Sequence, residues 1–142
     1  MGYKLNRNKD IITAEIEALT IEDLFAIACH AWKETALEST DTSSVEWKYA
    51  TFKADNYENL LTQLLTDLNS ILYSRKWVFN SFDKIEIAKS NDQIELNAEI
   101  LGEPFNEPSH ILKEEIKSIA IDKIITDDAN RNYSVKIVFE TI

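Results

Sequence analysis

The chain is poor in the residues that bend or cross-link a backbone. Its 142 residues include two glycines, two prolines and one cysteine. The single cysteine, Cys29, excludes a disulfide framework and a metal cluster built from thiolates. No apolar run approaches the ~20 residues that a helix needs to span a bilayer. No basic segment followed by an apolar one opens the sequence, so we expect a cytoplasmic protein rather than a secreted one.

Basic residues are also scarce. The chain has 15 Lys and Arg against 25 Asp and Glu, which gives a net charge of −10. Affinity for nucleic acid depends on Lys and Arg side chains that displace counterions from phosphates, and the sequence has no local stripe of them. The charge therefore argues against direct binding of RNA or DNA, and it favours a basic protein partner or divalent cations.

Hydrophobic periodicity predicts two helices. Thr20 and Asn56 are each suited to be an N-cap, and apolar residues at helical spacing follow both of them. Alternation of apolar and polar residues predicts strands over 10–18, 45–49, 85–87, 94–100, 116–125 and 135–139. We therefore predict a single α+β domain over residues 1–142, in which two amphipathic helices pack on a mostly antiparallel sheet of six or seven strands.

Nearly all of the glycine and proline lies in one segment, Leu101-Gly-Glu-Pro-Phe-Asn-Glu-Pro-Ser-His110. Glycine permits a positive φ and proline fixes φ, so their concentration predicts one shaped loop around Gly102. Loops of this kind often carry function. The pattern is compatible both with a docking loop and with a proline-stiffened hairpin connection.

Motifs of the common catalytic classes are missing. The sequence has no glycine-rich phosphate loop and no nucleophile elbow. His30 lies inside the first predicted helix, and we interpret it as a structural or surface residue, with Cys29 beside it as a small buried residue. Asp128, Asn130 and Asn132 alternate like the ligands of a calcium loop, but the glycine and distal glutamate of such a loop are absent. We interpret these three residues as a polar hairpin turn.

The remaining candidates for chemistry are carboxylates near the two ends of the chain. Asp10 lies at the start of the first predicted strand, and Glu140 lies close to the carboxylate of Ile142. In an antiparallel sheet the start of one strand can lie beside the end of another. Oxygen atoms that meet there would suit a hard cation such as Ca²⁺ or Mg²⁺. The alternative is that both residues are solvated acids at strand ends.

Three segments of the chain resemble the archease family. Thr20-Ile-Glu-Asp-Leu-Phe25 and the helix from Asn59 to Tyr73 are similar to the two helices of that family. Leu101-Gly-Glu-Pro-Phe-Asn106, followed by His110 and Glu115-Ile-Lys-Ser-Ile119, resembles its Gly-Glu-Pro-Phe loop and the strand after it. The segments occur in the family's order over essentially the whole chain, so the resemblance implies an archease-like fold.

The resemblance also implies a function. Archeases are protein cofactors of the RtcB-type tRNA-splicing RNA ligase, and they promote its guanylylation and multiple turnover without being enzymes themselves. The resemblance implies a divalent-metal site, with Ca²⁺ as the expected ion and Asp10, Glu140, Ile142 and Asp122 as the residues that hold it. The family's His-Thr-Ala-Asp motif aligns here as Arg7-Asn8-Lys9-Asp10. Only the aspartate is kept, and the two added positive charges disfavour a bound cation.

Two other functions stay open. One is a diverged protein-binding module of the same fold that has lost metal binding and serves another partner, which the charges of Arg7 and Lys9 favour. The other is a small metal-dependent hydrolase with Asp10, Asp122 and Glu140 as ligands. Such a hydrolase would need a metal-bound water and a nearby base, and the sequence offers no obvious histidine for that role.

Overall fold

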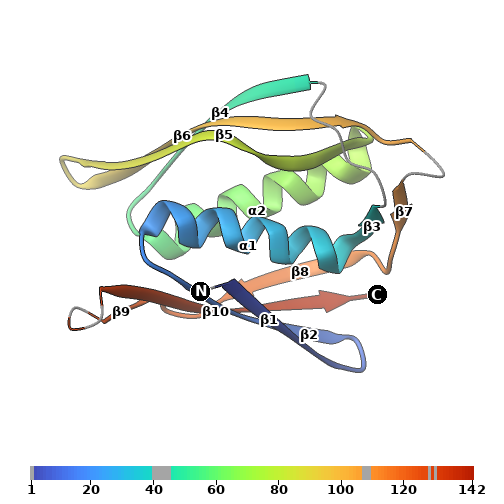
Figure 1. Ribbon diagram of the computed structural model, residues 1–142, viewed down its shortest axis with the longest axis horizontal. Coiled ribbons are helices and arrows are strands. Elements are labelled where there is room, and N and C mark those ends of the chain that lie inside the picture. The colour runs from blue at the N-terminus through green and yellow to red at the C-terminus, as the bar shows by residue number, and fades with distance from the viewer. Residues whose placement is uncertain (1, 40–45, 107–109, 128, 130) are drawn as a thin grey trace.

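Two helices lie between two antiparallel sheets in the computed structural model of the chain (Figure 1). The structure describes residues 2–39, 46–106, 110–127, 129 and 131–142. The helices are α1 (Ile21–Ala36) and α2 (Tyr57–Ser74). This layering gives each helix two apolar neighbours, one sheet above it and one below.

The sheet below the helices in Figure 1, here called the lower sheet, contains both ends of the described chain. Its strands follow the order β1-β2-β10-β8, and β9 also pairs with β10. Their bounds are β1 (Gly2–Asn8), β2 (Ile11–Ala18), β8 (Ile116–Ile121), β9 (Ile125–Asp127) and β10 (Asn132–Thr141). Every pairing in this sheet is antiparallel. Figure 1 shows the N and C labels on this same layer.

The upper sheet is a three-stranded antiparallel sheet with β6 at its centre. Its order is β4-β6-β5, with bounds β4 (Glu46–Ala54), β5 (Trp77–Ser90) and β6 (Gln93–Pro104). A short two-stranded piece, β3 (Leu37–Ser39) with β7 (His110–Leu112), continues from the end of α1. No helix in the described part of the chain is long and apolar enough to cross a membrane.

Both helices begin where the sequence predicts. The Thr20 side chain accepts a hydrogen bond from the Asp23 N–H at 3.0 Å, and the Asn56 side chain accepts one from the Asn59 N–H at 2.8 Å. Each bond satisfies a backbone donor that the first turn of a helix leaves free. The two N-cap predictions are therefore confirmed.

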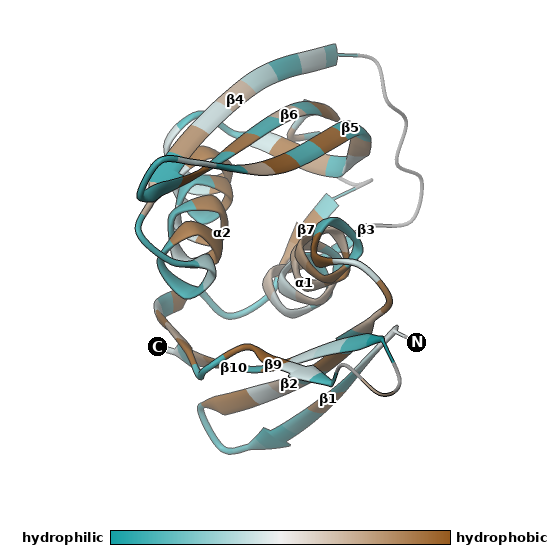
Figure 2. Ribbon diagram, turned by 90° about the vertical axis from the view of Figure 1, so that its left-hand side faces the viewer, coloured by the Kyte–Doolittle hydropathy of each residue, from teal (hydrophilic) through white to brown (hydrophobic). Residues whose placement is uncertain are grey.

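The core fills the space on both sides of the helices. In Figure 2 both helices lie between the two sheets and carry apolar residues, drawn in brown. In α1 the buried residues cover more than a single stripe, because the helix is enclosed by β2 below and β5 above; they are Ile21, Leu24, Phe25, Ala28, Cys29, Ala31, Trp32, Thr35 and Ala36. A helix that is apolar on most of its circumference is typical of such an enclosed position.

The predicted α+β class with two helices is confirmed, but the strand number is wrong. The described residues form ten strands rather than six or seven. The strands missed are β1, which is a largely exposed edge strand without alternation, and the three-residue strands β3, β7 and β9. Strands that bury little apolar surface leave no periodic pattern in the sequence.

The predicted loop at Gly102 is also wrong in part. Gly102 lies inside β6, opposite Glu46 on β4 and Phe79 on β5, and the strand continues to Pro104. Gly102 is not among the residues with positive φ. The side chain of Trp77 occupies the space beside it, so this glycine serves close packing rather than a turn. Pro108 lies outside the described residues.

Candidate functional site at the meeting of the chain ends

The beginning of β2 and the end of β10 lie side by side. Glu140 is opposite Ile11 in the register of these strands, and the Thr141 N–H donates a hydrogen bond to the Asp10 carbonyl oxygen at 2.8 Å. Asp10 belongs to the tight turn between β1 and β2, in which Lys9 has a φ of 59°. The antiparallel order of the lower sheet therefore places the main chain at Asp10 beside the main chain at Glu140 and Thr141.

A chain of polar contacts ties this turn to the segment before β8. Arg7 donates a hydrogen bond to the Oε2 atom of Glu114. The Thr141 Oγ1 atom lies 2.8 Å from the same carboxylate oxygen and 3.2 Å from the Asp10 carbonyl oxygen. These hydrogen bonds favour the ionised carboxylate, so they lower the pKa of Glu114, with the bond from Arg7 as the largest cause.

Glu140 has a cationic neighbour of its own. The Lys117 Nζ atom lies 3.4 Å from its Oε1 atom, and both side chains are partly exposed. We call the set of Arg7, Asp10, Glu114, Lys117, Glu140 and Thr141 the chain-end corner. It holds three carboxylates, and two of them are paired with a cationic side chain of the protein.

The chain-end corner does not fit a tight metal site. Among the residues that the structure describes, no group of three or more His, Cys, Asp or Glu side chains is arranged to hold a metal ion. A divalent cation here would have to displace Lys117 from Glu140 and would be repelled by Arg7. Asp10 is exposed and Glu140 is partly exposed, so a cation at either carboxylate would be mostly hydrated.

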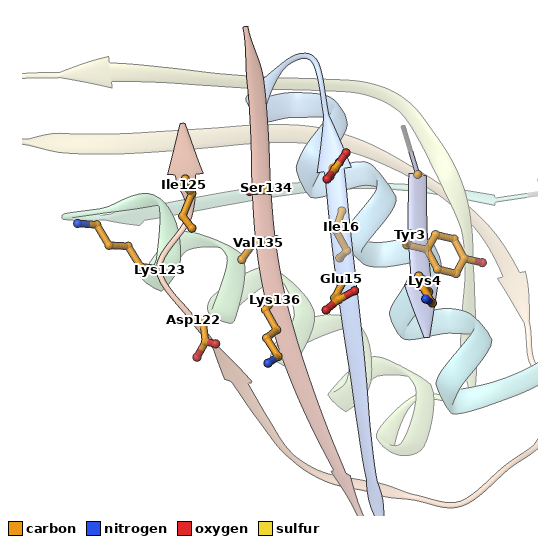
Figure 3. A pocket seen from close by; sticks show the side chains of 12 residues that line it. Tyr3, Lys4, Glu15, Ile16, Asp122, Lys123, Ile125, Ser134, Val135 and Lys136 are labelled. Carbon is orange, nitrogen blue, oxygen red and sulfur yellow. The ribbon is translucent and has the colours of Figure 1, made fainter. Parts of the chain in front are cut away.

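Asp122 lies away from this corner. It follows β8, and its N–H donates to the Lys136 carbonyl oxygen at 3.0 Å, four residues along β10 from Glu140. Four residues of a strand span about 13 Å. Figure 3 shows Asp122, Lys136, Glu15 and Lys4 in a row across the lower sheet, where they line a hollow of about 700 Å³. Asp122 therefore neighbours lysines and not the other acids predicted for the metal site.

The Gly-Glu-Pro-Phe segment builds a buried polar cluster instead. His110 is 1% exposed, and its Nδ1 atom accepts a hydrogen bond from the Asn106 N–H at 2.9 Å. Its Nε2 atom lies 2.9 Å from Glu103 Oε1, so the ring carries its hydrogen on Nε2 and donates it to that carboxylate. These bonds pin the chain after Pro104 to β7. The geometry supports a structural role for His110.

Cys29 and His30 are adjacent on α1 but differ in burial. Cys29 is fully buried, and burial raises the pKa of its thiol well above the usual value. His30 is half-buried with its ring centroid 5.5 Å from that of Phe79, and burial, followed by the charge of Lys33, lowers its pKa. Asp128 and Asn130 lie outside the described residues, and Asn132 begins β10.

The Arg7–Glu114 contact predicts an acid-dependent contribution to stability. Because the pKa of Glu114 is lowered on folding, its contribution is present above the usual carboxyl range and is lost as the pH falls through the lowered value. Both side chains are about half exposed, so we expect only a small effect. Urea denaturation of Arg7→Gln should show a lower midpoint than the wild type at pH 7, and the difference should shrink as the pH falls below the usual carboxyl range.

A matched control for this measurement is Lys84→Gln. Lys84 pairs with Glu86 at 3.2 Å on the upper sheet, where both side chains are more exposed. The pKa of Glu114 depends on Arg7 and not on this pair. An Arg7→Gln midpoint that follows the wild type at every pH would show that the contact contributes nothing to folding.

The comparison with family models identifies the family, and the comparison with solved structures shows the fold. The Archease protein family (MTH1598/TM1083) matches the chain over residues 10–140. The solution structure of Methanobacterium thermoautotrophicum protein 1598 superposes with a TM-score of 0.81 at 18% identity, covering 98% of each chain, and so shows that the fold is shared. A search of curated protein sequences gave no match. Because the family match extends over nearly the whole chain, the protein belongs to the Archease protein family.

Proposed function

We propose that this protein is an activator of an RtcB-type tRNA-splicing RNA ligase. In this role it promotes guanylylation of the ligase and its multiple turnover, and it catalyses no reaction itself. The family match over residues 10–140 carries the proposal. The net charge of −10 supports it, because an acidic surface suits a basic protein partner better than a phosphate backbone.

The test is a guanylylation assay with the RtcB-type ligase of the same organism. Guanylylated ligase is measured over time with labelled GTP and divalent metal, with and without the protein, and the number of RNA joining events per ligase is counted. We expect a faster approach to full guanylylation and more than one turnover when the protein is present. Equal rates and equal turnover with an excess of the protein would refute the proposal.

Variants of the chain-end corner test whether this corner is the surface that acts on the ligase. Asp10→Ala removes an exposed acid from the β1–β2 turn, and Asp92→Ala removes one from the β5–β6 turn of the opposite sheet. We expect the Asp10 variant to lose activation and the Asp92 variant to keep it. Equal activation by both would assign the activity to another surface.

Ca²⁺ binding at the corner stays a prediction, and calorimetric titration decides it. We expect a dissociation constant of about 1 mM for the wild type, because the cation competes with Lys117 and is repelled by Arg7. Lys117→Ala should strengthen binding and Asp10→Ala should abolish it, whereas Lys84→Ala should leave it unchanged. Equal, negligible heats for the wild type and Asp10→Ala would show that the corner holds no cation.

A second candidate is a binding module of the same fold that works without a cation and serves a different partner. The observation that favours it is the pairing of Glu114 and Glu140 with cationic side chains of the protein itself. An absence of Ca²⁺ binding together with unchanged ligase guanylylation would support this candidate. An absence of Ca²⁺ binding with faster guanylylation would leave the ligase as the partner.

A further inference from the structure

Two large aromatic side chains are exposed on the outer face of the upper sheet. Trp47 is 59% exposed and Tyr49 is 69% exposed. They are two residues apart on β4, so they lie on the same face, and the alternate residues of the strand are the ones that approach the core. Packing in the core therefore does not explain why these two positions are aromatic. The pair presents apolar surface to solvent.

The two rings pack edge to face and both stay largely exposed. Their centroids are 4.8 Å apart and the rings are nearly perpendicular, at 74°. The neighbouring strand β6 places Leu101 opposite Trp47 and Glu99 opposite Tyr49. A cation over an aromatic face is attracted by the ring quadrupole, and a carboxylate close by strengthens the attraction for an arginine.

The charges around the pair favour a cationic ligand. The Glu99 carboxylate, through hydrogen bonding and its charge, raises the pKa of Tyr49. Lys84 lies opposite Glu99 in the register of β5 and β6, and it is paired with Glu86 at 3.2 Å. A hollow of about 170 Å³ lies beside Tyr49, between Thr51 and Glu99. An arginine side chain that stacks on these rings would lie close to the Glu99 carboxylate on the neighbouring strand.

β4 is also an edge strand. It pairs with β6 along all nine of its residues, and the order of the sheet ends at β4, so no strand of the described chain pairs with its other side. Figure 2 shows β4 as the outermost strand of the upper sheet. Residues 46–54 contain neither proline nor glycine. A regular edge of this length can accept an added strand through its main-chain groups.

We propose that β4 binds an extended, arginine-bearing segment of a protein partner by strand addition, with the arginine over Trp47 and Tyr49. Main-chain hydrogen bonds to the edge supply affinity, and the aromatic pair with Glu99 selects the side chain. The net charge of −10 favours the same ligand at longer range. This inference concerns a surface on the sheet opposite to the chain-end corner and does not require that the partner be an RNA ligase.

The test uses a synthetic nine-residue peptide in which arginine alternates with valine and threonine. Trp32 and Trp77 are buried, so Trp47 is the exposed tryptophan and its fluorescence reports binding directly. We expect saturable quenching by this peptide. A peptide with glutamate in place of arginine should bind about tenfold more weakly or worse, and so should an arginine peptide that is N-methylated at alternate amides.

Protein variants complete the test. Peptide binding to the variants is followed by amide NMR chemical shifts, because Trp47→Thr loses the fluorescence signal. Trp47→Thr and Tyr49→Thr keep a residue that favours strands and should each weaken arginine-peptide binding about tenfold. Ile125→Thr is the matched control, since Ile125 is 60% exposed on the other sheet, and should bind as the wild type does.

Each of three results would overturn the proposal. They are no binding of the arginine peptide at millimolar concentration, equal binding of the arginine and glutamate peptides, and tighter binding of a uridine octanucleotide than of any peptide. The last result would assign the rings to base stacking. All of these measurements use synthetic ligands, so they can fail or succeed independently of the ligase assay.

Discussion

Gly102→Ala is expected to destabilise the protein by about 3 kcal/mol, although the substitution adds one methyl group. A Cβ atom at this position would lie 2.2 Å from the Val78 carbonyl oxygen and 2.5 Å from the ring of Trp77. The first of these atoms is backbone and cannot rotate away. Reduced freedom of the unfolded chain would offset only about 0.4–1 kcal/mol. The steric clash is the larger of the two effects, so the substitution is expected to lower the free energy of unfolding.

The ring of Trp77 is also held in place. Its Nε1–H donates to Glu46 Oε1 at 2.8 Å, and the Lys48 ammonium lies 5.1 Å from the ring centroid. A shift of this ring to make room for a methyl group would break or weaken both contacts. The cost of the substitution should therefore appear as a separation of β5 from β6 at this end of the sheet.

Urea denaturation measures this effect as a lower unfolding midpoint at an unchanged m-value. Gly2→Ala is the control. Gly2 is the other glycine of the chain, and a Cβ atom there meets nothing within 4 Å, although its φ of 136° is unfavourable for alanine. Because the end of β1 can relax, we expect a loss of no more than about 1 kcal/mol. A Gly102→Ala variant as stable as Gly2→Ala would contradict the packing argument.

The fold could be predicted where burial imposes a period on the sequence. β2, β6 and β10 each have one buried face, and the alternation along them predicted their positions. β5 runs from Trp77 to Ser90, but only 85–87 was predicted. Its register against β6 shifts twice, between Phe79 and Ser81 and between Phe82 and Lys84. Each irregularity changes the phase of the alternation, so the first half of the strand carries no regular pattern.

For the candidate site, the sequence predicts which strand ends adjoin but not which side chains make contact. Asp10 and Glu140 were expected to meet because antiparallel strands place a beginning beside an end, and the main chains do so. The contact of Arg7 with Glu114 joins residues 107 positions apart. Glu114 lies between β7 and β8 and outside any periodic element, so no pattern in the sequence points to this pair. From the sequence, only the positive charges of Arg7 and Lys9 beside Asp10 argue against a bound cation there.

Asn69→Leu is expected to destabilise the protein by about 2–3 kcal/mol. Asn69 lies on α2 and joins three elements through its side chain. Its Oδ1 atom accepts a hydrogen bond from the fully buried Trp32 on α1 at 3.0 Å, and its Nδ2 atom donates to the Ile116 carbonyl oxygen on β8 at 3.3 Å. Leucine has a similar volume, so the change leaves an indole N–H and a carbonyl without their partners rather than opening a cavity.

The exposed counterpart of this substitution is Asn97→Leu. Asn97 also accepts a side-chain hydrogen bond, from Thr51 at 2.8 Å, but it lies on the solvent face of the upper sheet, where water can replace the lost partner. We expect its free energy of unfolding to change by no more than about 0.5 kcal/mol. Both variants lose a side-chain hydrogen bond, but only Asn69→Leu leaves a buried donor without a partner. The difference between their free energies of unfolding therefore measures the cost of that buried donor.

A double-mutant cycle with Trp32→Phe tests the contact itself. Phenylalanine keeps an aromatic ring in the core but has no N–H group, so it removes the donor that Asn69→Leu leaves without an acceptor. The double variant should therefore be more stable than the sum of the two losses predicts, by about 1–2 kcal/mol. Strict additivity would mean that Trp32 and Asn69 are not coupled. The stability of the helix layer would then rest on apolar packing alone, and the polar link from α1 through α2 to the lower sheet would have no energetic role.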